Sequence, residues 1–196
     1  MSTAQSPDER PLEIAIIIGS VRKDRLSERA ARLIATRAEA AGHHPRLVDL
    51  RELALPIYDE EEATEQHPGV LAYKALLSGV DATAWLSPEY NYTFTAAIKN
   101  AIEHTPKLRQ TPAALCGLSS GPFGGGRAIE HLRQVMPDMG AVAIPRIMRF
   151  SDAKNLFEGD ELKRPEIAQR VDDLLGELAW YARALRWGRE NLPPLR

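Results

Sequence analysis

The chain has 196 residues, of which 44% are hydrophobic and 27% are charged, the balance of an ordinary soluble globular protein. This length supports one well-buried core. The formal net charge of −2 supplies no overall positive field, so we expect neither a nucleic-acid nor a membrane partner. No apolar run is long enough to span a bilayer, and residues 1–11 lack the apolar core of a secretory signal. We therefore expect a cytoplasmic protein, with a disordered lead at 1–11 and a single domain at 12–196.

The hydrophobic patterns predict alternating strands and helices. The β-branched run Glu13–Ile18 is typical of a strand buried on both faces. The other predicted strands are His44–Leu50, Ala82–Leu86, Thr111–Leu118 and Ala141–Ile147. Proline cannot donate to a sheet ladder, so the third strand should end before Pro88. Helical spacing and breakers predict helices at Ser27–Ala41, Gly69–Ser78, Thr95–His104, Arg127–Met136 and Pro165–Gly188. Residues 152–163 read as a polar connection.

This alternation predicts an α/β fold in which right-handed crossovers place the strands in one parallel sheet covered by helices on both faces. Five such units suit the flavodoxin-like three-layer sandwich with strand order 2-1-3-4-5. Ligands in these sheets bind beyond the carboxyl ends of the strands, near the switch point between strands 1 and 3. The rule selects three loops, which are Gly19–Leu26, Ser87–Thr95 and Ser119–Gly126.

The first loop has the composition of an anion site. Ser20 and Ser27 offer hydroxyl donors, Arg22 and Arg25 offer charge-assisted contacts, and the following helix offers unpaired N–H groups. The loop lacks the Gly-Lys-Ser/Thr end of a P-loop and has one glycine where a dinucleotide fingerprint has three. A solvated basic turn, with Ser27 as an ordinary N-cap, stays open as the alternative.

The second loop combines polar and aromatic residues. Asn91 and backbone N–H groups suit the polar edge of a flat heterocycle, and Tyr90 suits its face. The alternative is a turn in which Tyr90 and Phe94 cover the sheet edge and Asn91 caps the next helix. Lys99 and Asn100 in that helix are expected to tie it to neighbouring loops.

The third loop has four glycines within residues 121–126, which permit a ligand to approach the backbone closely. A flexible connector is the alternative. Arg127 meets an anion at the entrance or is a solvated residue of the helix's first turn. The five histidines show no metal-ligand spacing, and no Ser/His/Asp triad stands out. The lone Cys116 excludes an internal disulfide and reads as a small buried hydrophobe.

With these loops in place, the chain resembles the NADPH-dependent FMN reductase family of flavodoxin-like proteins, which includes flavin, quinone, azo-dye and chromate reductases. Ser87–Asn91 followed by Ile98–Asn100 is similar to the family's PEYN…LKN signature. Gly19–Arg22 is similar to its GSxR phosphate loop, and Gly124–Ala128 to its GG-R-A segment. The chain departs from the family pattern at Glu28, Tyr92 and Thr95, which affects the expected pocket shape and substrate access.

The resemblance implies that Ser20, Arg22 and Ser27 bind the FMN phosphate. It also implies that residues 88–91 line the ribityl chain and the ring, and that the glycine-rich loop meets the pyrimidine end. The expected cofactor-binding set is Ser20, Arg22, Arg25, Leu26, Ser27, Pro88, Glu89, Tyr90, Asn91, Ser120, Gly121 and Gly124. The inclusion of Arg25 in this set is based on its charge alone.

The function expected from this resemblance is an NAD(P)H oxidoreductase that passes hydride from NADPH or NADH through bound FMN to a small electron acceptor. The acceptor would be a flavin, a quinone, an azo compound or a metal oxyanion. The flavin carries the chemistry, so no catalytic side chain and no metal are expected. A non-catalytic FMN-binding electron carrier or sensor is the alternative. The apolar residues of the last predicted helix, together with the resemblance, predict a homodimer or homotetramer.

Overall fold

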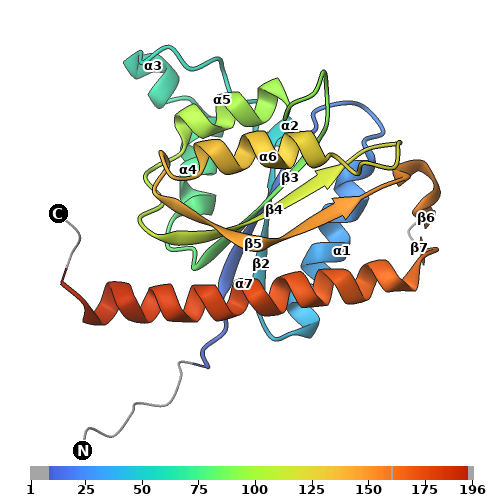
Figure 1. Cartoon of the computed structure of the whole chain (residues 1–196). Coiled ribbons are helices and arrows are strands. Elements are labelled where there is room, and N and C mark those ends of the chain that lie inside the picture. Colours follow the sequence, from blue (N-terminus) through green and yellow to red (C-terminus); the bar gives the residue numbers. More distant parts are fainter. Residues whose placement is uncertain (1–8, 160, 194–196) are drawn as a thin grey trace, which may run out of the picture.

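The computed structural model describes residues 9–159 and 161–193. At its centre lies a five-stranded sheet with the order β2-β1-β3-β4-β5, in which every neighbouring pair is parallel (Figure 1). The strands are β1 (Glu13–Ile18), β2 (His44–Asp49), β3 (Ala82–Pro88), β4 (Thr111–Leu118) and β5 (Ala141–Phe150). The expected α/β class and strand order are therefore confirmed. Residues 1–8 of the expected disordered lead lie outside the described residues.

Helices cover both faces of this sheet. One face packs against α1 (Leu26–Ala40) and the long α7 (Pro165–Asn191). The other face packs against α4 (Pro68–Leu77), α5 (Ala96–His104) and α6 (Gly126–Val135). The short helices α2 (Leu50–Leu53) and α3 (Glu62–Glu65) were not predicted, because four residues are too few to display a helical period. No helix in the described part of the chain is both long and apolar enough to cross a membrane.

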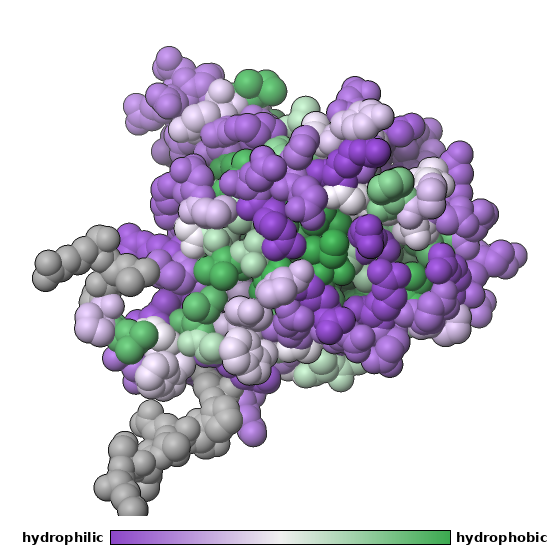
Figure 2. All heavy atoms as spheres, viewed as in Figure 1, coloured by the Kyte–Doolittle hydropathy of each residue, from purple (hydrophilic) through white to green (hydrophobic). Residues whose placement is uncertain are grey.

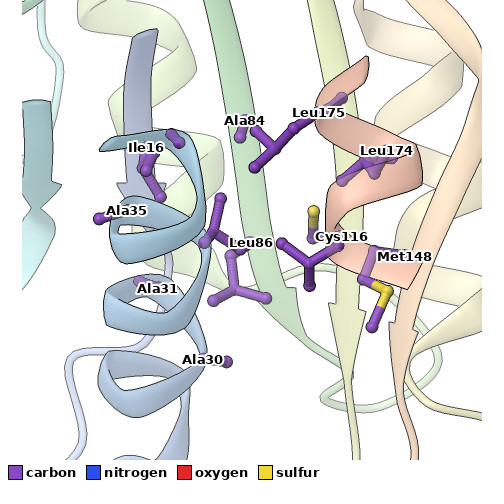
Figure 3. Packing of buried hydrophobic residues seen from close by; sticks show 14 of the residues in the cluster. Ile16, Ala30, Ala31, Ala35, Ala84, Leu86, Cys116, Met148, Leu174 and Leu175 are labelled. Atoms are coloured by element: carbon purple, nitrogen blue, oxygen red, sulfur yellow. The ribbon is translucent and has the colours of Figure 1, made fainter. Parts of the chain in front are cut away.

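Small residues on α1 let this helix lie close to the sheet. Ala30, Ala31 and Ala35 face Ile16 of β1 and Leu86 of β3 across a tightly packed layer, and α7 closes the same layer (Figure 3). Cys116 of β4 is fully buried there, and desolvation raises the pKa of its thiol to about 12. The expectation of a small buried hydrophobe at this position is thus confirmed.

Two strands extend beyond their predicted ends. β3 continues through Ser87 and Pro88, whose pairing partner in β4 is Leu118. The prediction that the strand ends before this proline was wrong, since a proline at the last strand position forfeits only one donor. β5 continues to Phe150 after a register shift opposite residues 113–115 of β4. Residues 152–163, expected to be a polar connection, contain a 3-10 turn η1 (Ala153–Asn155) and the small antiparallel pair β6 (Phe157–Glu158) and β7 (Glu161–Leu162).

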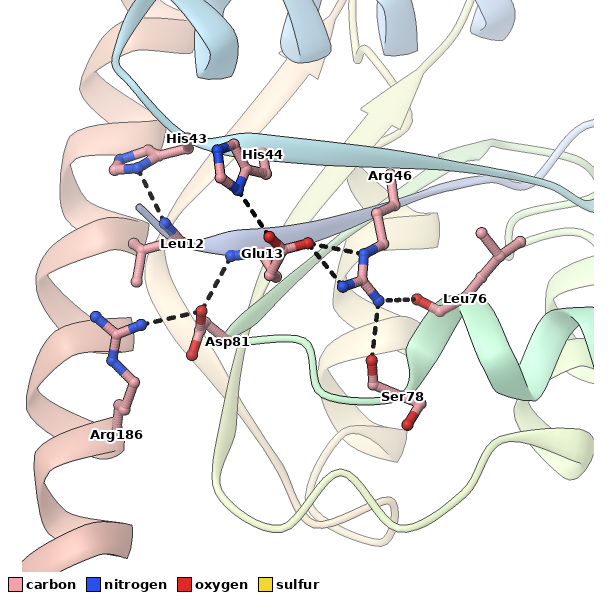
Figure 4. Close-up of polar contacts among 9 residues, drawn as sticks. All are labelled: Leu12, Glu13, His43, His44, Arg46, Leu76, Ser78, Asp81 and Arg186. Atoms are coloured by element: carbon pink, nitrogen blue, oxygen red, sulfur yellow. Dashed lines mark hydrogen bonds and ion pairs between the residues drawn. The ribbon is translucent and has the colours of Figure 1, made fainter. Parts of the chain in front are cut away.

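Polar contacts fix the amino end of the sheet, on the side away from the three loops (Figure 4). Asp81, just before β3, accepts from the Glu13 backbone N–H at 3.0 Å and from the buried Arg186 of α7 at 3.1 Å. The Glu13 carboxylate accepts from His44 and Arg46 of β2, and these contacts lower its pKa. The starts of β1, β2 and β3 are therefore held in register with one another and with α7.

Candidate functional site

The three loops expected to bind a ligand meet beyond the carboxyl ends of β1, β3 and β4. They enclose a cavity of about 450 Å³. Nine of the twelve residues of the expected set line it, namely Ser20, Arg22, Arg25, Leu26, Ser27, Pro88, Glu89, Tyr90 and Ser120. Asn91, Gly121 and Gly124 do not line the cavity.

The start of α1 supplies donors to this cavity. The residue before the helix is Arg25, whose side chain makes no capping hydrogen bond. The first backbone N–H groups of the helix therefore have no side-chain cap and point toward the cavity end of the helix. Ser27 is the second residue of the helix, so the alternative in which it is an ordinary N-cap is wrong. Its Oγ is buried and has no hydrogen-bond partner among the described residues.

Arg25 is not a solvated residue, because its side chain is only 3% exposed. The guanidinium forms an ion pair with Asp49 at the end of β2, and Glu28 lies 3.4 Å away. Its Nε and Nη1 are buried and have no hydrogen-bond partner within residues 9–159 and 161–193. One edge of Arg25 is thus committed to the protein, whereas two of its nitrogens remain available to a ligand.

Tyr90 connects the first and second loops. Its hydroxyl lies 3.3 Å from the Oγ of Ser20, and the guanidinium of Arg22 lies 5.7 Å from the centre of its ring. The cavity therefore has a flat aromatic wall beside a group of hydroxyl and guanidinium donors.

The second loop turns sharply after Tyr90. Tyr90 and Thr93 exchange two backbone hydrogen bonds of 3.0 and 3.1 Å, and the intervening Asn91 and Tyr92 both have positive φ, 47° and 70°. This is the geometry of a two-residue hairpin turn, for which asparagine is well suited. Thr95 caps α5 by accepting from the Ile98 N–H, so the alternative in which Asn91 caps that helix is wrong.

Glu89 is engaged by the third loop. Its carboxylate accepts from the backbone N–H of Arg127 at 3.1 Å and from the Arg127 guanidinium at 2.9 Å. That guanidinium also lies 4.3 Å from the ring centre of Tyr92 and 4.9 Å from that of Phe123. Arg127 is thus a first-turn residue of α6 whose side chain is 42% exposed but also held by Glu89 and two aromatic rings.

The glycine-rich loop lies directly on β4. A Cβ atom on Gly117 would come within 2.5 Å of the Gly124 carbonyl oxygen, and Gly124 and Gly125 both adopt positive φ. These glycines allow two backbone segments to touch, which holds the loop in one position. Gly124 thus supports the cavity wall from behind and does not line the cavity itself.

Lys154 lines the cavity and was missed from the sequence. It belongs to η1, which is attached to the third loop by hydrogen bonds from Ala153 N–H to the Ser119 carbonyl and from Asp152 N–H to the Gly121 carbonyl. The only available signal was its position just after the fifth strand, at the same edge of the sheet.

Asn100 ties α5 to a neighbouring loop, as expected. Its side chain donates to the Pro56 carbonyl at 2.7 Å and accepts from the Tyr58 N–H at 3.0 Å. Lys99 instead pairs with Glu103 of its own helix, so its expected tie to a neighbouring loop was wrong. No cluster of three potential metal-ligating side chains occurs in the part of the chain that the structure describes.

These features fit a phosphate group that is joined to a flat ring. The buried hydroxyl of Ser27, two nitrogens of Arg25 and the uncapped start of α1 are donors that have no partner among the described residues, as the site of a bound anion requires. Arg22, Lys23 and Lys154 supply three cations to the lining, against the carboxylates of Asp24 and Glu89, and Glu89 is already paired with Arg127. The fold is that of a flavodoxin-like protein, and its cavity has the shape and donors that suit a mononucleotide with a planar ring.

Residues 12–155 match the sequence model of the family described as NADPH-dependent FMN reductase. The chain is 31% identical over 149 residues to an NAD(P)H-dependent FMN reductase of Pseudomonas aeruginosa, covering 71% of this chain and 80% of that one. It is 30% identical over 191 residues to a probable NADPH:quinone oxidoreductase of Oryza sativa, covering 92% and 94%. The solved structure of the flavoenzyme NAD(P)H:acceptor oxidoreductase FerB from Paracoccus denitrificans has a similar fold, with a TM-score of 0.73 at 24% identity, covering 87% and 97%.

The chain therefore belongs to the NADPH-dependent FMN reductase family. Family membership confirms the expected oxidoreductase class and the expected cofactors FMN and NAD(P)H.

Proposed function

We propose that the protein binds FMN in the cavity between the three loops and uses it to pass hydride from NAD(P)H to a small electron acceptor. The acceptor class is a flavin, a quinone, an azo compound or a metal oxyanion. The observation that carries this proposal is the group of buried donors without protein partners, Ser27 Oγ with Arg25 Nε and Nη1, at the start of α1.

The chain's own residues bind and orient the cofactor. The hydroxyls of Ser20 and Ser27, the guanidinium groups of Arg22 and Arg25, and the first N–H groups of α1 neutralise and fix the phosphate. Bound FMN supplies the hydride-transfer chemistry. Tyr90 and the backbone of Pro88 and Glu89 border the ring, while Ser120 meets its polar end. The Glu89 carboxylate is already occupied by Arg127, so it fixes the neighbouring loop and leaves ring contacts to the backbone.

No side chain is required as a general acid or base in this scheme. The described residues around the cavity contribute position, charge and exclusion of water. Substitutions in the cavity should therefore act mainly through cofactor affinity.

We also propose a cytoplasmic homodimer or homotetramer. Apolar side chains gather in the middle of one face, over β5 and between α6 and α7, and polar residues surround them (Figure 2). On α7, Trp180 is 65% exposed and Trp187 is 49% exposed. Burying these two α7 side chains between copies removes apolar area from water. Analytical ultracentrifugation tests this part, and sedimentation at the monomer mass alone would contradict it.

The reductase proposal is tested by adding NADPH anaerobically to the purified protein loaded with FMN. The flavin absorbance should bleach and then return when a quinone or free flavin is added. A non-catalytic carrier or sensor would bind FMN but keep its oxidised spectrum in the presence of NADPH, which would overturn the proposal.

A further inference from the structure

A second cavity, of about 370 Å³, is lined by residues of the second loop, the third loop, α6 and β5. Aromatic and aliphatic walls come from Tyr92, Phe123 and Ile147, and polar groups come from Arg127, His131 and Arg149. Glu89 connects the two cavities, since it lines the first and holds Arg127 of the second. The walls of the two cavities therefore meet at the Glu89–Arg127 ion pair.

Tyr92 is displayed at this cavity in spite of an unfavourable backbone. Its φ of 70° is in the left-handed region, which costs a residue with a side chain about 1 kcal/mol. The ring is nevertheless 67% exposed and stacks on the Arg127 guanidinium. An exposed aromatic ring held in a strained turn has no packing role in the core, so its accessible face is available to a planar ligand.

The opposite aromatic wall is equally accessible. Phe123 is 58% exposed and also contacts the guanidinium of Arg127. Glu89 accepts hydrogen bonds from the Arg127 guanidinium and backbone N–H, and these bonds favour one position for the arginine that both rings contact. The pocket is thus preorganised for a flat aromatic group.

Arg149 supplies the positive charge that remains available in this cavity. It is exposed, and its guanidinium has no hydrogen bond or ion pair with any of the residues described. Its side chain lies along the glycine-rich loop, where a Cβ on Gly124 would come within 2.7 Å of Arg149 Cβ. His131 adds a second donor: when its Nδ1 accepts from the Thr93 hydroxyl at 2.9 Å, its Nε2 carries the proton. Glu130 is the opposing carboxylate in the lining.

We propose that this second cavity binds the adenosine 2′-phosphate half of NADPH, with Tyr92 and Phe123 against the adenine and Arg149 on the 2′-phosphate. The proposal rests on the proposed reductase function, in which the nicotinamide end reaches the first cavity. It makes Arg149 a residue that determines the preference for NADPH over NADH, because NADH lacks the 2′-phosphate.

The decisive variant is Arg149→Gln, which removes the charge at an exposed position and keeps a polar side chain. Adenosine 2′,5′-bisphosphate and 5′-AMP are titrated by calorimetry into the FMN-loaded protein. One lost charge-assisted contact should weaken bisphosphate binding by about 10-fold or more and leave 5′-AMP binding unchanged. In turnover, KM for NADPH should rise by a similar factor, while KM for NADH and kcat stay the same.

Arg146→Gln is the matched control, because Arg146 lies on the same strand but pairs with Glu177 and does not line the cavity. It should change neither titration. Tyr92→Gly removes the ring and relieves the backbone strain, and it should weaken both nucleotides to a similar extent.

Equal binding of the bisphosphate by wild-type protein and Arg149→Gln would overturn the proposal, as would a parallel rise of KM for NADPH and NADH. The titration requires no turnover. Failure of the reductase function would therefore appear separately, as a flavin that NADPH does not bleach.

Discussion

Replacing Ser27 by alanine separates ligand binding from folding. The Ser27 Oγ is buried without a hydrogen-bond partner in the described residues, so its loss breaks no hydrogen bond within them. A buried hydroxyl that lacks a partner carries a desolvation penalty of about 1–3 kcal/mol. The variant without ligand should therefore melt at the wild-type temperature or a few degrees higher, given about 2–4 °C per kcal/mol for a chain of this size.

FMN affinity should move in the opposite direction. A hydrogen bond from a hydroxyl to a charged phosphate contributes about 1.5–3 kcal/mol, so Ser27→Ala should raise the Kd roughly 10-fold to 150-fold. Quenching of flavin fluorescence on titration with apoprotein measures the Kd, and circular dichroism measures the melting temperature.

Ser87→Ala is the contrasting control for stability. Its buried Oγ donates to the Pro88 carbonyl at 2.8 Å and accepts from the Thr95 N–H at 3.3 Å, so this variant should melt at a lower temperature. The reasoning fails if Ser27→Ala binds FMN as the wild type does, or if it melts as low as Ser87→Ala.

Three further variants test other parts of the account. Gly117→Ala forces its new Cβ against the Gly124 carbonyl, so it should lower the free energy of unfolding by about 1–3 kcal/mol and weaken FMN binding. An unfolding free energy equal to that of the wild type, measured by calorimetry, would contradict this close contact. Arg25→Ala leaves Asp49 without its ion-pair partner, so urea titration should show a loss of about 1–3 kcal/mol in the free energy of unfolding. The same variant should bind FMN more weakly. If Arg25 were merely solvated, neither quantity would change. Burial holds the pKa of the His43 imidazole below its ordinary value of 6.5. The unfolded chain therefore takes up a proton at His43 more readily than the folded chain does, and the free energy of unfolding falls as the pH drops below that value. His43→Gln should flatten this loss between about pH 7.5 and 5.5, and an unchanged slope would exclude His43 as its source.

The fold was predictable where the hydrophobic pattern is long and uniform. The run Glu13–Ile18 and the alternation that follows it predicted the five strands, and the flavodoxin-like arrangement of five such units predicted their order. Short elements such as α2 and α3 have no period to detect. The end of β3 was misplaced because the cost of a proline depends on its position within the strand.

The site was predictable only in part, for physical reasons. The sequence places donors in the first loop, but it does not reveal that Arg25 reaches Asp49 at the end of a neighbouring strand. Nor does Asn91-Tyr92 resemble a common hairpin turn, because a tyrosine at positive φ is unfavourable on its own. Lys154 lies at the cavity because backbone hydrogen bonds attach its segment to the third loop, and the sequence does not show these bonds.

The central claim is that the loop from Gly19 to Ser27 binds the phosphate of FMN. Parallel titrations of the apoprotein with FMN and with riboflavin test it most directly, because the two ligands share the ring and the ribityl chain and differ in the phosphate. Two or more charge-assisted contacts to that group predict that FMN binds at least about 100-fold more tightly than riboflavin, with one FMN per chain. Equal affinities for the two ligands would contradict the account.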